Sequence, residues 1–301
     1  YILAIDMGGT NPRISMIDDS YTLLKVQTLQ YTKPLIPQIN AYLAVVAEEG
    51  LTTDSCCICA AAIVEDSKVR LTNANISFSV DEIIEQTYLE NVMIINDFEA
   101  IAYAVQSNKI PAQEVISAPN ASGNVAIIGP GTGLGVAFII NGSVVTSEGG
   151  HSAPPALYPE FLSWLERKLH TRHICAETIL SGSGISYLYE WKTGQEFSAE
   201  KIATSKDPLA QTCMKIFMSY LGAFCHSMAL TGMTTGGIFL AGGILPKNVE
   251  YLLQGNFTHH FLAAYHQDMK EFVRNIPVQL ITDYNCSLLG CRIAFECRRA
   301  L

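Results

Sequence analysis

Short apolar runs bounded by glycine, proline or polar residues recur along the chain, and helical patterns separate several of them. The runs that predict buried strands cover residues 1–5, 56–64, 92–95, 125–128, 238–240 and 277–282. From 209 to 228, apolar side chains keep to one face at spacings of three and four residues. This spacing predicts a helix that Asp207 caps, Pro208 begins and Gly232 follows. The alternation of strands and helices predicts an α/β protein with largely buried sheets.

The pattern of the N-terminal segment returns in the middle of the chain. Residues 2–20 lie without gaps on residues 125–143, and both read as apolar strand, glycine-rich turn, apolar strand and polar turn. Any two glycine-turn hairpins look alike, so chance can produce such a match. Two such hairpins opening two halves of one chain nevertheless suggest a duplicated fold with a cleft between lobes. Ligands usually bind in a cleft of this kind.

Composition indicates a globular chain that is too large for one core. The 301 residues are 49% hydrophobic and 16% charged, and single cores stop growing at roughly 250–300 residues. The net charge of −9, with no basic stripe to offset it, argues against nucleic acid or an anionic membrane surface as a partner. An anionic ligand would therefore be held by backbone N–H groups, a metal ion or a few placed cations.

One uncharged stretch, 216–246, meets the crude length rule for a transmembrane helix. Glycines and threonines between 232 and 237 interrupt it, so a buried helix followed by a buried strand is the better interpretation. No signal peptide is visible. The nine cysteines are odd in number and lack framework spacing, which favours thiols in a reducing compartment. We therefore expect a cytoplasmic protein with no membrane partner.

The first glycine-rich turn follows the buried run 1–5. Gly8 and Gly9 let the backbone pass close to a ligand and turn its N–H groups toward an anion. Asp6 is placed to hold Mg²⁺ through water, and Thr10 and Asn11 offer hydrogen bonds to phosphate. An ordinary hairpin turn is the alternative interpretation.

The second turn, 129–135, has glycine at alternate positions. It does not match the dinucleotide fingerprint GxGxxG, and it does not open a helix. The chain also lacks the GK[ST] of a Walker A loop. Two phosphate-binding hairpins of another kind are therefore predicted.

Asp97 follows the apolar run 92–95 and begins a helical pattern that continues to Val105. A carboxylate at the end of a buried strand can accept the proton of a hydroxyl that attacks phosphorus, because phosphoryl transfer needs positioning more than strong base chemistry. The alternative is that Asp97 serves only as the helix N-cap.

Three further segments carry candidate chemistry. Glu148 and His151 flank two glycines and together offer an acceptor and a donor for adjacent sugar hydroxyls, although a surface loop is the alternative. Glu177 is a third carboxylate or a helix first-turn acid. Gly242 and Gly243 follow a buried strand and would let a flat adenine lie against the backbone, although plain strand–loop packing explains them too.

Taken together, these segments resemble the bacterial glucokinase family of the hexokinase, actin and Hsp70-like ATPase superfamily, outside its ROK branch. Seven motifs occur in family order: DMGGTN, LTN at 71–73, NDFEA, GPGTGLG, EGGH, ExxLSGSG and GGIFLAGGI. Each is weak alone, but seven in order are specific. The resemblance implies two RNase H-like lobes with a central cleft, a small domain over 1–107 plus 283–301 and a large domain over 108–282.

The resemblance also implies a reaction, ATP-dependent phosphorylation of glucose at the 6-hydroxyl, with Mg²⁺ as cofactor and a homodimer as the assembly. It makes Asp97 the general base. The sugar-binding residues it implies are Asn73, Asn96, Asp97, Glu148, His151 and Glu177. The ATP-binding residues it implies are Asp6, Gly8, Gly9, Thr10, Asn11, Gly131, Thr132, Gly133, Gly242 and Gly243.

Some positions depart from the family pattern, namely Pro12, Ala60–Ala62, Ile76 and the segment 152–155. They lie near the expected sugar pocket, so they bear on sugar preference rather than on reaction class. A kinase for another hexose or amino sugar is the nearest alternative. A sugar sensor without turnover and a peptide-binding or filament-forming ATPase of the same superfamily are the others.

Overall fold

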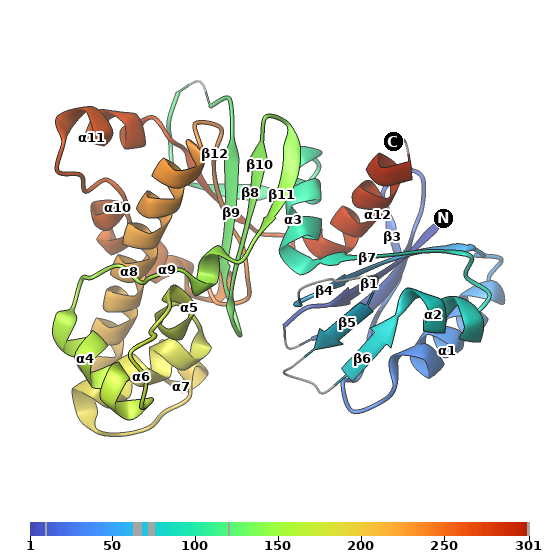
Figure 1. Ribbon diagram of the computed structural model, residues 1–301, viewed down its shortest axis with the longest axis horizontal. Helices are drawn as coiled ribbons and strands as arrows, with labels where there is room; N and C mark the ends of the chain where they lie inside the picture. The colour runs from blue at the N-terminus through green and yellow to red at the C-terminus, as the bar shows by residue number, and fades with distance from the viewer. Residues whose placement is uncertain (10, 63–67, 72–75, 120, 300–301) are drawn as a thin grey trace. The chain divides into compact units, whose positions relative to one another are not determined.

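The computed structural model describes residues 1–9, 11–62, 68–71, 76–119 and 121–299 (Figure 1). The chain forms two compact α/β units. Unit 1 comprises Tyr1–Ile110 and Asp283–Leu301, and unit 2 comprises Pro111–Thr282. The predicted α/β fold class with two lobes is confirmed, whereas the central cleft and the exact domain limits stay predictions.

Unit 1 is built on a five-stranded sheet with the order β3-β2-β1-β4-β7. Its strands are β1 (Ile2–Met7), β2 (Arg13–Ile17), β3 (Leu23–Thr28), β4 (Ser55–Ala60) and β7 (Asn91–Asn96). Neighbours β1, β2 and β3 run antiparallel, and β4 and β7 run parallel to β1. A separate hairpin pairs β5 (Lys68–Leu71) with β6 (Ile76–Ser79).

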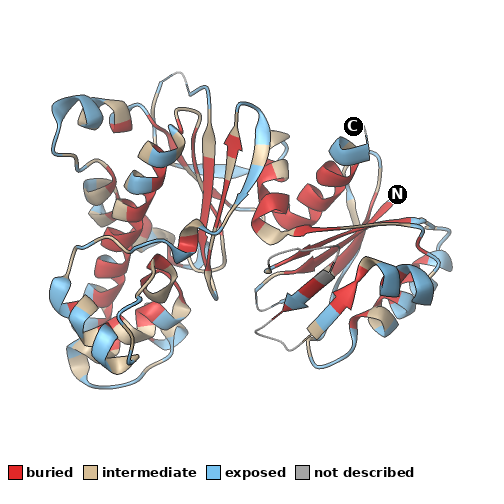
Figure 2. Ribbon diagram, viewed as in Figure 1, coloured by how far each residue is buried: buried red, intermediate tan, exposed pale blue. Residues whose placement is uncertain are grey.

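Helices cover both faces of this sheet, which explains why β1 and β4 are apolar throughout. Side chains of β1 that point to one face, such as Leu3 and Ile5, pack with Ile39 and Leu43 of α1 (Leu35–Ala47). Ala4 on the other face packs with α3 (Asp97–Gln106) and α12 (Cys286–Arg299). The buried strands and the inner sides of these helices are red in Figure 2. The short helix α2 is Val80–Gln86.

Unit 2 repeats this topology and adds one strand. Its sheet has the order β11-β10-β9-β12-β13-β8, and its first five strands have the same relative directions as those of unit 1. The strands are β8 (Ala112–Ile116), β9 (Val125–Pro130), β10 (Leu134–Ile140), β11 (Ser143–Ser147), β12 (Gly237–Leu240) and β13 (Val278–Ile281). The matching segments 2–20 and 125–143 form the corresponding hairpins β1–β2 and β9–β10.

Helix α8 (Pro208–Gly232) forms the centre of the second core. Asp207 caps it by accepting hydrogen bonds from the N–H groups of Leu209 and Ala210, both at 3.3 Å. The predicted end was wrong by one residue: Gly232 is still helical, and Met233 takes the left-handed C-cap conformation with φ 48°. A side chain at position 232 would overlap the ring of Phe138, which explains the glycine there.

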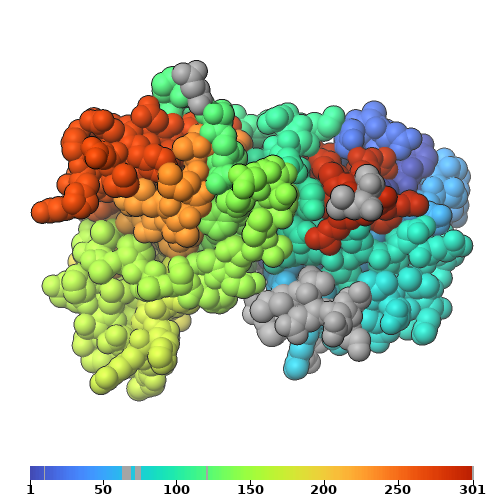
Figure 3. Space-filling view, turned by 45° about the horizontal axis from the view of Figure 1, so that its top comes forward, coloured from blue at the N-terminus to red at the C-terminus, as the bar shows by residue number. Residues whose placement is uncertain are grey.

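By length and apolar composition alone, α8 would qualify as a membrane-spanning helix, but 72% of its most apolar window is buried within the protein. It is a core helix followed by the buried strand β12, as the sequence predicted. The remaining helices are η1 (Gly149–His151), α4 (Pro159–Lys168), α5 (Ala176–Ile179), α6 (Gly182–Thr193), α7 (Ala199–Ala203), η2 (Pro246–Asn248), α9 (Val249–Leu253), α10 (Asn256–Phe261) and α11 (Gln267–Arg274). Figure 3 shows the orange-red α10–α11 segment at the surface of unit 2.

A close helix crossing in unit 1 gives a stability prediction. Gly290 of α12 lies so near α3 that a Cβ at this position would overlap the carbonyl oxygen of Ala100. Alanine would normally improve helix propensity by about 1 kcal/mol, but here we expect Gly290→Ala to lower the free energy of unfolding by about 1–3 kcal/mol through overpacking. Thermal unfolding followed by far-UV circular dichroism measures the effect. Cys297→Ala, at an exposed position on the same helix, serves as the control. An unfolding midpoint of Gly290→Ala equal to or above that of the wild-type chain would contradict the close contact between α12 and α3.

Candidate active site

Asp97 is the first residue of α3, directly after β7. The N-cap is Asn96, whose side-chain oxygen accepts hydrogen bonds from the N–H groups of Phe98 at 2.9 Å and Glu99 at 3.3 Å. Asp97 Oδ1 accepts a bond from the N–H of Phe98, the next residue, at 3.0 Å. The alternative that Asp97 is merely the helix cap is therefore wrong, because its neighbour has that role.

The second oxygen of Asp97 lies beside the first glycine-rich turn. A Cβ built on Gly8 would be 3.0 Å from Asp97 Oδ2 and 3.0 Å from Asp6 Oδ1. Because Asp97 Oδ2 and Asp6 Oδ1 are each 3.0 Å from the Cβ position of Gly8, the two oxygens are at most twice 3.0 Å apart. Only a residue without a side chain leaves this space open, so the first turn has a clear requirement for glycine. The following Gly9 has φ 59° and open space around it.

Asp6 is buried and accepts hydrogen bonds from three donors. Its Oδ1 accepts the Gly8 N–H at 2.8 Å, and its Oδ2 accepts the Ser287 hydroxyl at 2.6 Å and an Arg13 N–H. Arg13 faces Asp6 across the β1–β2 hairpin, and its other terminal nitrogen donates to the side chain of Asn285 at 2.9 Å. This network fixes the turn to the start of α12.

Sequence reasoning missed three residues around these carboxylates. Arg13 carried a usable signal, since it is a basic residue in the strand that returns from the turn. Ser287 carried none, because it lies at the other end of the chain. Tyr31 was also missed: burial raises the pKa of its phenol, and the charges of Asp6 and Asp97 raise it further. The tyrosine therefore stays neutral beside the carboxylate pair.

Two predicted residues, Thr10 and Asn73, lie outside the described residues. Asn11 is exposed and donates from its side-chain amide to the hydroxyl of Tyr284 at 3.2 Å. Asn96 uses its amide nitrogen for a weak bond to the carbonyl oxygen of Ala62 at 3.4 Å, in addition to its capping bonds.

The second glycine-rich turn lies in unit 2 and is braced by Glu177. The Gly131 N–H donates to the carbonyl of Gly133 at 2.7 Å, which closes the turn. Glu177 Oε2 accepts the N–H of Leu134 at 2.8 Å, and a Cβ at Gly133 would overlap this carboxylate. Thr132 between the two glycines is exposed. Glu177 therefore holds the turn.

Glu148 directly precedes the short helix η1, and His151 is its last residue. Their side chains approach one another, with Glu148 Oε2 at 3.8 Å from His151 Nε2. Contact with the thiol of Cys175 raises the pKa of His151 against the opposing effect of partial burial, and Glu177 and Glu148 add to the increase. The structure thus brings Glu148, His151 and Glu177 into one electrostatic group. The turn Gly131–Gly133 joins the same region through the Glu177 carboxylate.

The predicted adenosine-binding pair has two different structural roles. Gly242 has φ 84°, and a Cβ there would overlap the carbonyl oxygen of Pro130, so the residue allows close packing on the end of β9. No atom outside the neighbouring residues lies within 4 Å of the Cβ position of Gly243. Gly243 therefore leaves open space next to its backbone, as a flat base would need.

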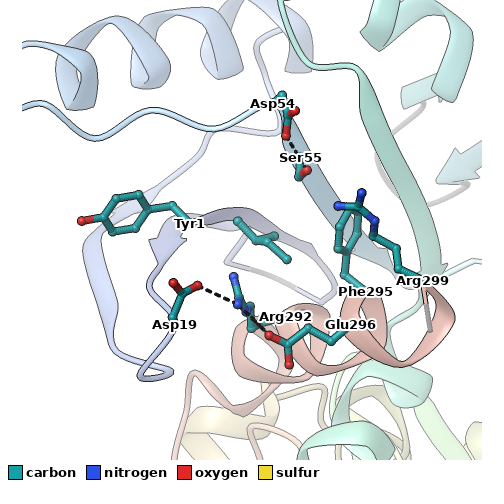
Figure 4. A pocket seen from close by; sticks show the side chains of 9 residues that line it. Tyr1, Asp19, Asp54, Ser55, Arg292, Phe295, Glu296 and Arg299 are labelled. Carbon is teal, nitrogen blue, oxygen red and sulfur yellow. Dashed lines mark hydrogen bonds and ion pairs between the residues drawn. The ribbon is translucent and has the colours of Figure 1, made fainter.

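A pocket of about 510 Å³ opens in unit 1 away from Asp97 (Figure 4). One of its two arginines, Arg292, is paired with Asp19 at 3.0 Å and with Glu296 at 2.6 Å. The Ser55 hydroxyl in its lining donates to Asp54 at 2.6 Å. Within the described part of the chain, no three His, Cys, Asp or Glu side chains are grouped to hold a metal ion.

Known proteins resemble this chain along almost its whole length. The family model described as "Glucokinase" matches residues 3–297. A glucokinase of Nitrobacter hamburgensis is 31% identical, with 95% of this chain and 94% of that protein covered. The crystal structure of a glucokinase from an Antarctic psychrotroph has a TM-score of 0.81 and 29% identity, and it covers 98% of both chains. A Balamuthia mandrillaris glucokinase, at 21% identity and TM-score 0.80 over 98% of this chain and 92% of that one, shows the shared fold. The chain belongs to the glucokinase family.

Proposed function

We propose that this chain transfers the γ-phosphoryl group of ATP to the 6-hydroxyl of glucose, giving glucose 6-phosphate and ADP. Membership of the glucokinase family supports ATP-dependent phosphorylation of glucose. The observation that carries the mechanism is the position of Asp97, whose Oδ2 borders the glycine turn at Gly8. A carboxylate beside a potential phosphate-binding turn is the arrangement that this reaction requires.

Asp97 acts as the general base in this proposal. Its Oδ1 is fixed by the Phe98 N–H, which orients the carboxylate and leaves Oδ2 directed at the turn. The hydroxyl proton passes to Asp97 as the sugar oxygen forms its bond to the γ-phosphorus and the bond to the bridging oxygen of ADP breaks. Positioning and charge neutralisation lower the barrier more than base strength does.

The two glycine turns hold the phosphates. Backbone N–H groups of Gly8 and Gly9, with Asn11 nearby, serve in unit 1, and those of residues 131–133 serve in unit 2. Asp6 fits an outer-sphere role toward Mg²⁺, because three donors already engage its carboxylate and a water can use the remaining acceptor capacity. Bound Mg²⁺ would neutralise phosphate charge.

The sugar is bound by carboxylates and an imidazole. Glu148, His151 and Glu177 form one group in unit 2, and Asn96 adjoins Asp97 in unit 1. Carboxylate oxygens accept hydrogen bonds from adjacent hydroxyls, and a protonated His151 donates one. Asn73 remains a further candidate by family resemblance.

The decisive experiment is an ADP-release assay across glucose, fructose, mannose, galactose and N-acetylated amino sugars, with the product identified by NMR. We expect the highest kcat/KM with glucose and phosphorylation at the 6-hydroxyl. A higher kcat/KM for another sugar would favour the alternative kinase. Glucose binding by calorimetry with no ADP released would favour the sensor.

The cytoplasmic location and the homodimer also belong to this proposal. The homodimer rests on the family resemblance. The location rests on the resemblance and on the thiol-rich composition. Light scattering of the purified protein tests the dimer, and fractionation of the source cells tests the location.

A further inference from the structure

Two of the nine cysteines reach solvent. Cys297 is exposed near the end of α12, and Cys175 is half-buried immediately before α5, whereas the other seven are buried. Burial raises the pKa of buried thiols such as Cys56 and Cys225 and keeps them unreactive. Cys175 and Cys297 are therefore the thiols that a reagent can reach, and they provide an internal comparison.

Cys175 lies at one end of a chain of three chemically complementary groups. Its Sγ is 3.8 Å from His151 Nδ1 and 3.4 Å from the hydroxyl of Thr178. The opposite nitrogen of the same imidazole, Nε2, is 3.8 Å from Glu148 Oε2. A thiol, an imidazole and a carboxylate in this order follow the logic of an activated nucleophile, its base and the group that orients the base. A backbone bond from the Ala176 N–H to the carbonyl of Ser152, at 2.8 Å, ties α5 to the segment that carries His151.

The charges around the thiol favour its ionised form. Partial burial alone would raise the pKa of Cys175, but hydrogen bonds from Thr178 and His151 and the nearby charge of His151 outweigh it and lower the pKa. The carboxylates of Glu148 and Glu177 also face His151 and favour its protonated form. The thiol and the imidazole thus favour each other's charged form, in the kind of surroundings that create reactive cysteines.

We propose that Cys175 is a nucleophilic thiolate paired with His151, that hydroperoxides and alkylating reagents modify it, and that this modification shuts off sugar binding. The link to sugar binding rests on the proposed role of His151, whereas the reactivity of the thiol does not. The site is a modification site in addition to the kinase centre.

The oxidation step balances within these groups and the peroxide. The thiolate attacks one oxygen of the hydroperoxide, an S–O bond forms and the O–O bond breaks. The sulfur loses two electrons and the peroxide gains them. The leaving oxygen takes the proton of the His151 imidazolium and departs as water or an alcohol. The product is a sulfenic acid beside a neutral His151, and a dithiol restores the thiol through a mixed disulfide with release of water.

The consequence for the sugar follows from the same contacts. Oxidation removes the negative charge that favours the imidazolium, so His151 loses the proton with which it would donate to a sugar hydroxyl. The added oxygen also enters a gap of 3.8 Å between Sγ and Nδ1 and displaces the ring. Glucose affinity should therefore fall while the glycine turns remain intact.

The reactivity is tested by timed labelling of the full chain with iodoacetamide, with both peptides quantified by mass spectrometry between pH 6 and 8.5. We expect Cys175 to react about 10-fold faster than Cys297 at pH 6.5, with the gap narrowing toward pH 8.5 as ordinary thiols ionise. In His151→Asn the rate at Cys175 should fall to that of Cys297. Equal labelling rates of Cys175 and Cys297 in the wild-type chain would overturn the proposal. An unchanged labelling rate of Cys175 in His151→Asn would overturn it too.

The effect on sugar binding is tested in a Cys297→Ser background with hydrogen peroxide. We expect kinase activity to be lost, glucose to slow the loss and dithiothreitol to restore activity. Cys175→Ser also lacks the thiolate charge beside His151, so it should bind glucose more weakly than the parent from the start. Its remaining activity at high glucose should resist peroxide. Equal inactivation of Cys175→Ser would overturn the modification site. Fast labelling of Cys175 that glucose does not slow would instead overturn its link to the sugar. Activity measured before oxidation tests the proposed kinase function independently of both.

Discussion

Replacing Asp97 by asparagine should lower kcat by about 10²–10⁴-fold, the range that a positioned general base contributes. The substitution keeps the shape of the side chain and the bond that its Oδ1 accepts from the Phe98 N–H. It removes the ability of the second oxygen, beside Gly8, to take the hydroxyl proton. Because Asn96 and not Asp97 caps α3, the helix should remain stable. Glucose affinity measured by calorimetry should stay close to the wild-type value.

Asp81→Asn is the matched control for this experiment. Asp81 is also an acidic residue in the first turn of a helix in unit 1, but it is exposed and belongs to α2. Its substitution should leave kcat unchanged. Turnover of Asp97→Asn at the wild-type rate would remove Asp97 from the mechanism, whereas loss of glucose affinity would show that it acts mainly in binding.

The sequence predicted the centre of the fold better than its edges. Strands buried on both faces, such as β1 and β4, appear as apolar runs because helices cover both sides of the unit 1 sheet. Three of the four edge strands of the two large sheets, β3, β8 and β11, are mostly exposed and mix apolar with polar residues. Their pairing depends on neighbours that a local pattern does not reveal, so they were not predicted from apolar runs. The internal repeat supplied the information that apolar runs lacked, since it predicted two related hairpins.

Prediction of the site had a similar limit. Asp97 and Asp6 follow buried strands and carry recognisable chemistry, so the sequence singled them out. Their partners come from distant parts of the chain: Ser287 reaches Asp6 from the C-terminal helix. Cys175 and His151 are separated by 24 residues and meet only because α5 packs beside η1. Contacts of this kind depend on tertiary structure, and no spacing rule in the sequence indicates them.

The ion pair between Arg13 and Asp6 gives the second large expected effect. Both side chains are nearly buried, with exposed fractions of 11% and 6%. In Arg13→Met the carboxylate of Asp6 would keep its bonds from Gly8 and Ser287 but lose its compensating charge. Breaking a buried pair by removing one partner typically costs about 3–5 kcal/mol. We expect a loss of that size in stability, seen as faster amide hydrogen exchange in β1 and β2.

Two further variants separate the pair from a general effect of removing an arginine. Arg274→Met, at an exposed position on α11, should change exchange in β1 and β2 little. Asp6→Asn combined with Arg13→Met should recover part of the loss, because no buried charge then remains unpaired. Since Asp6 also accepts the Gly8 N–H, Arg13→Met should raise KM for ATP more than KM for glucose. If Arg13→Met loses no more stability than Arg274→Met, the ion pair does not hold the turn. If Arg13→Met leaves the KM for ATP unchanged, Asp6 does not set the phosphate-binding geometry.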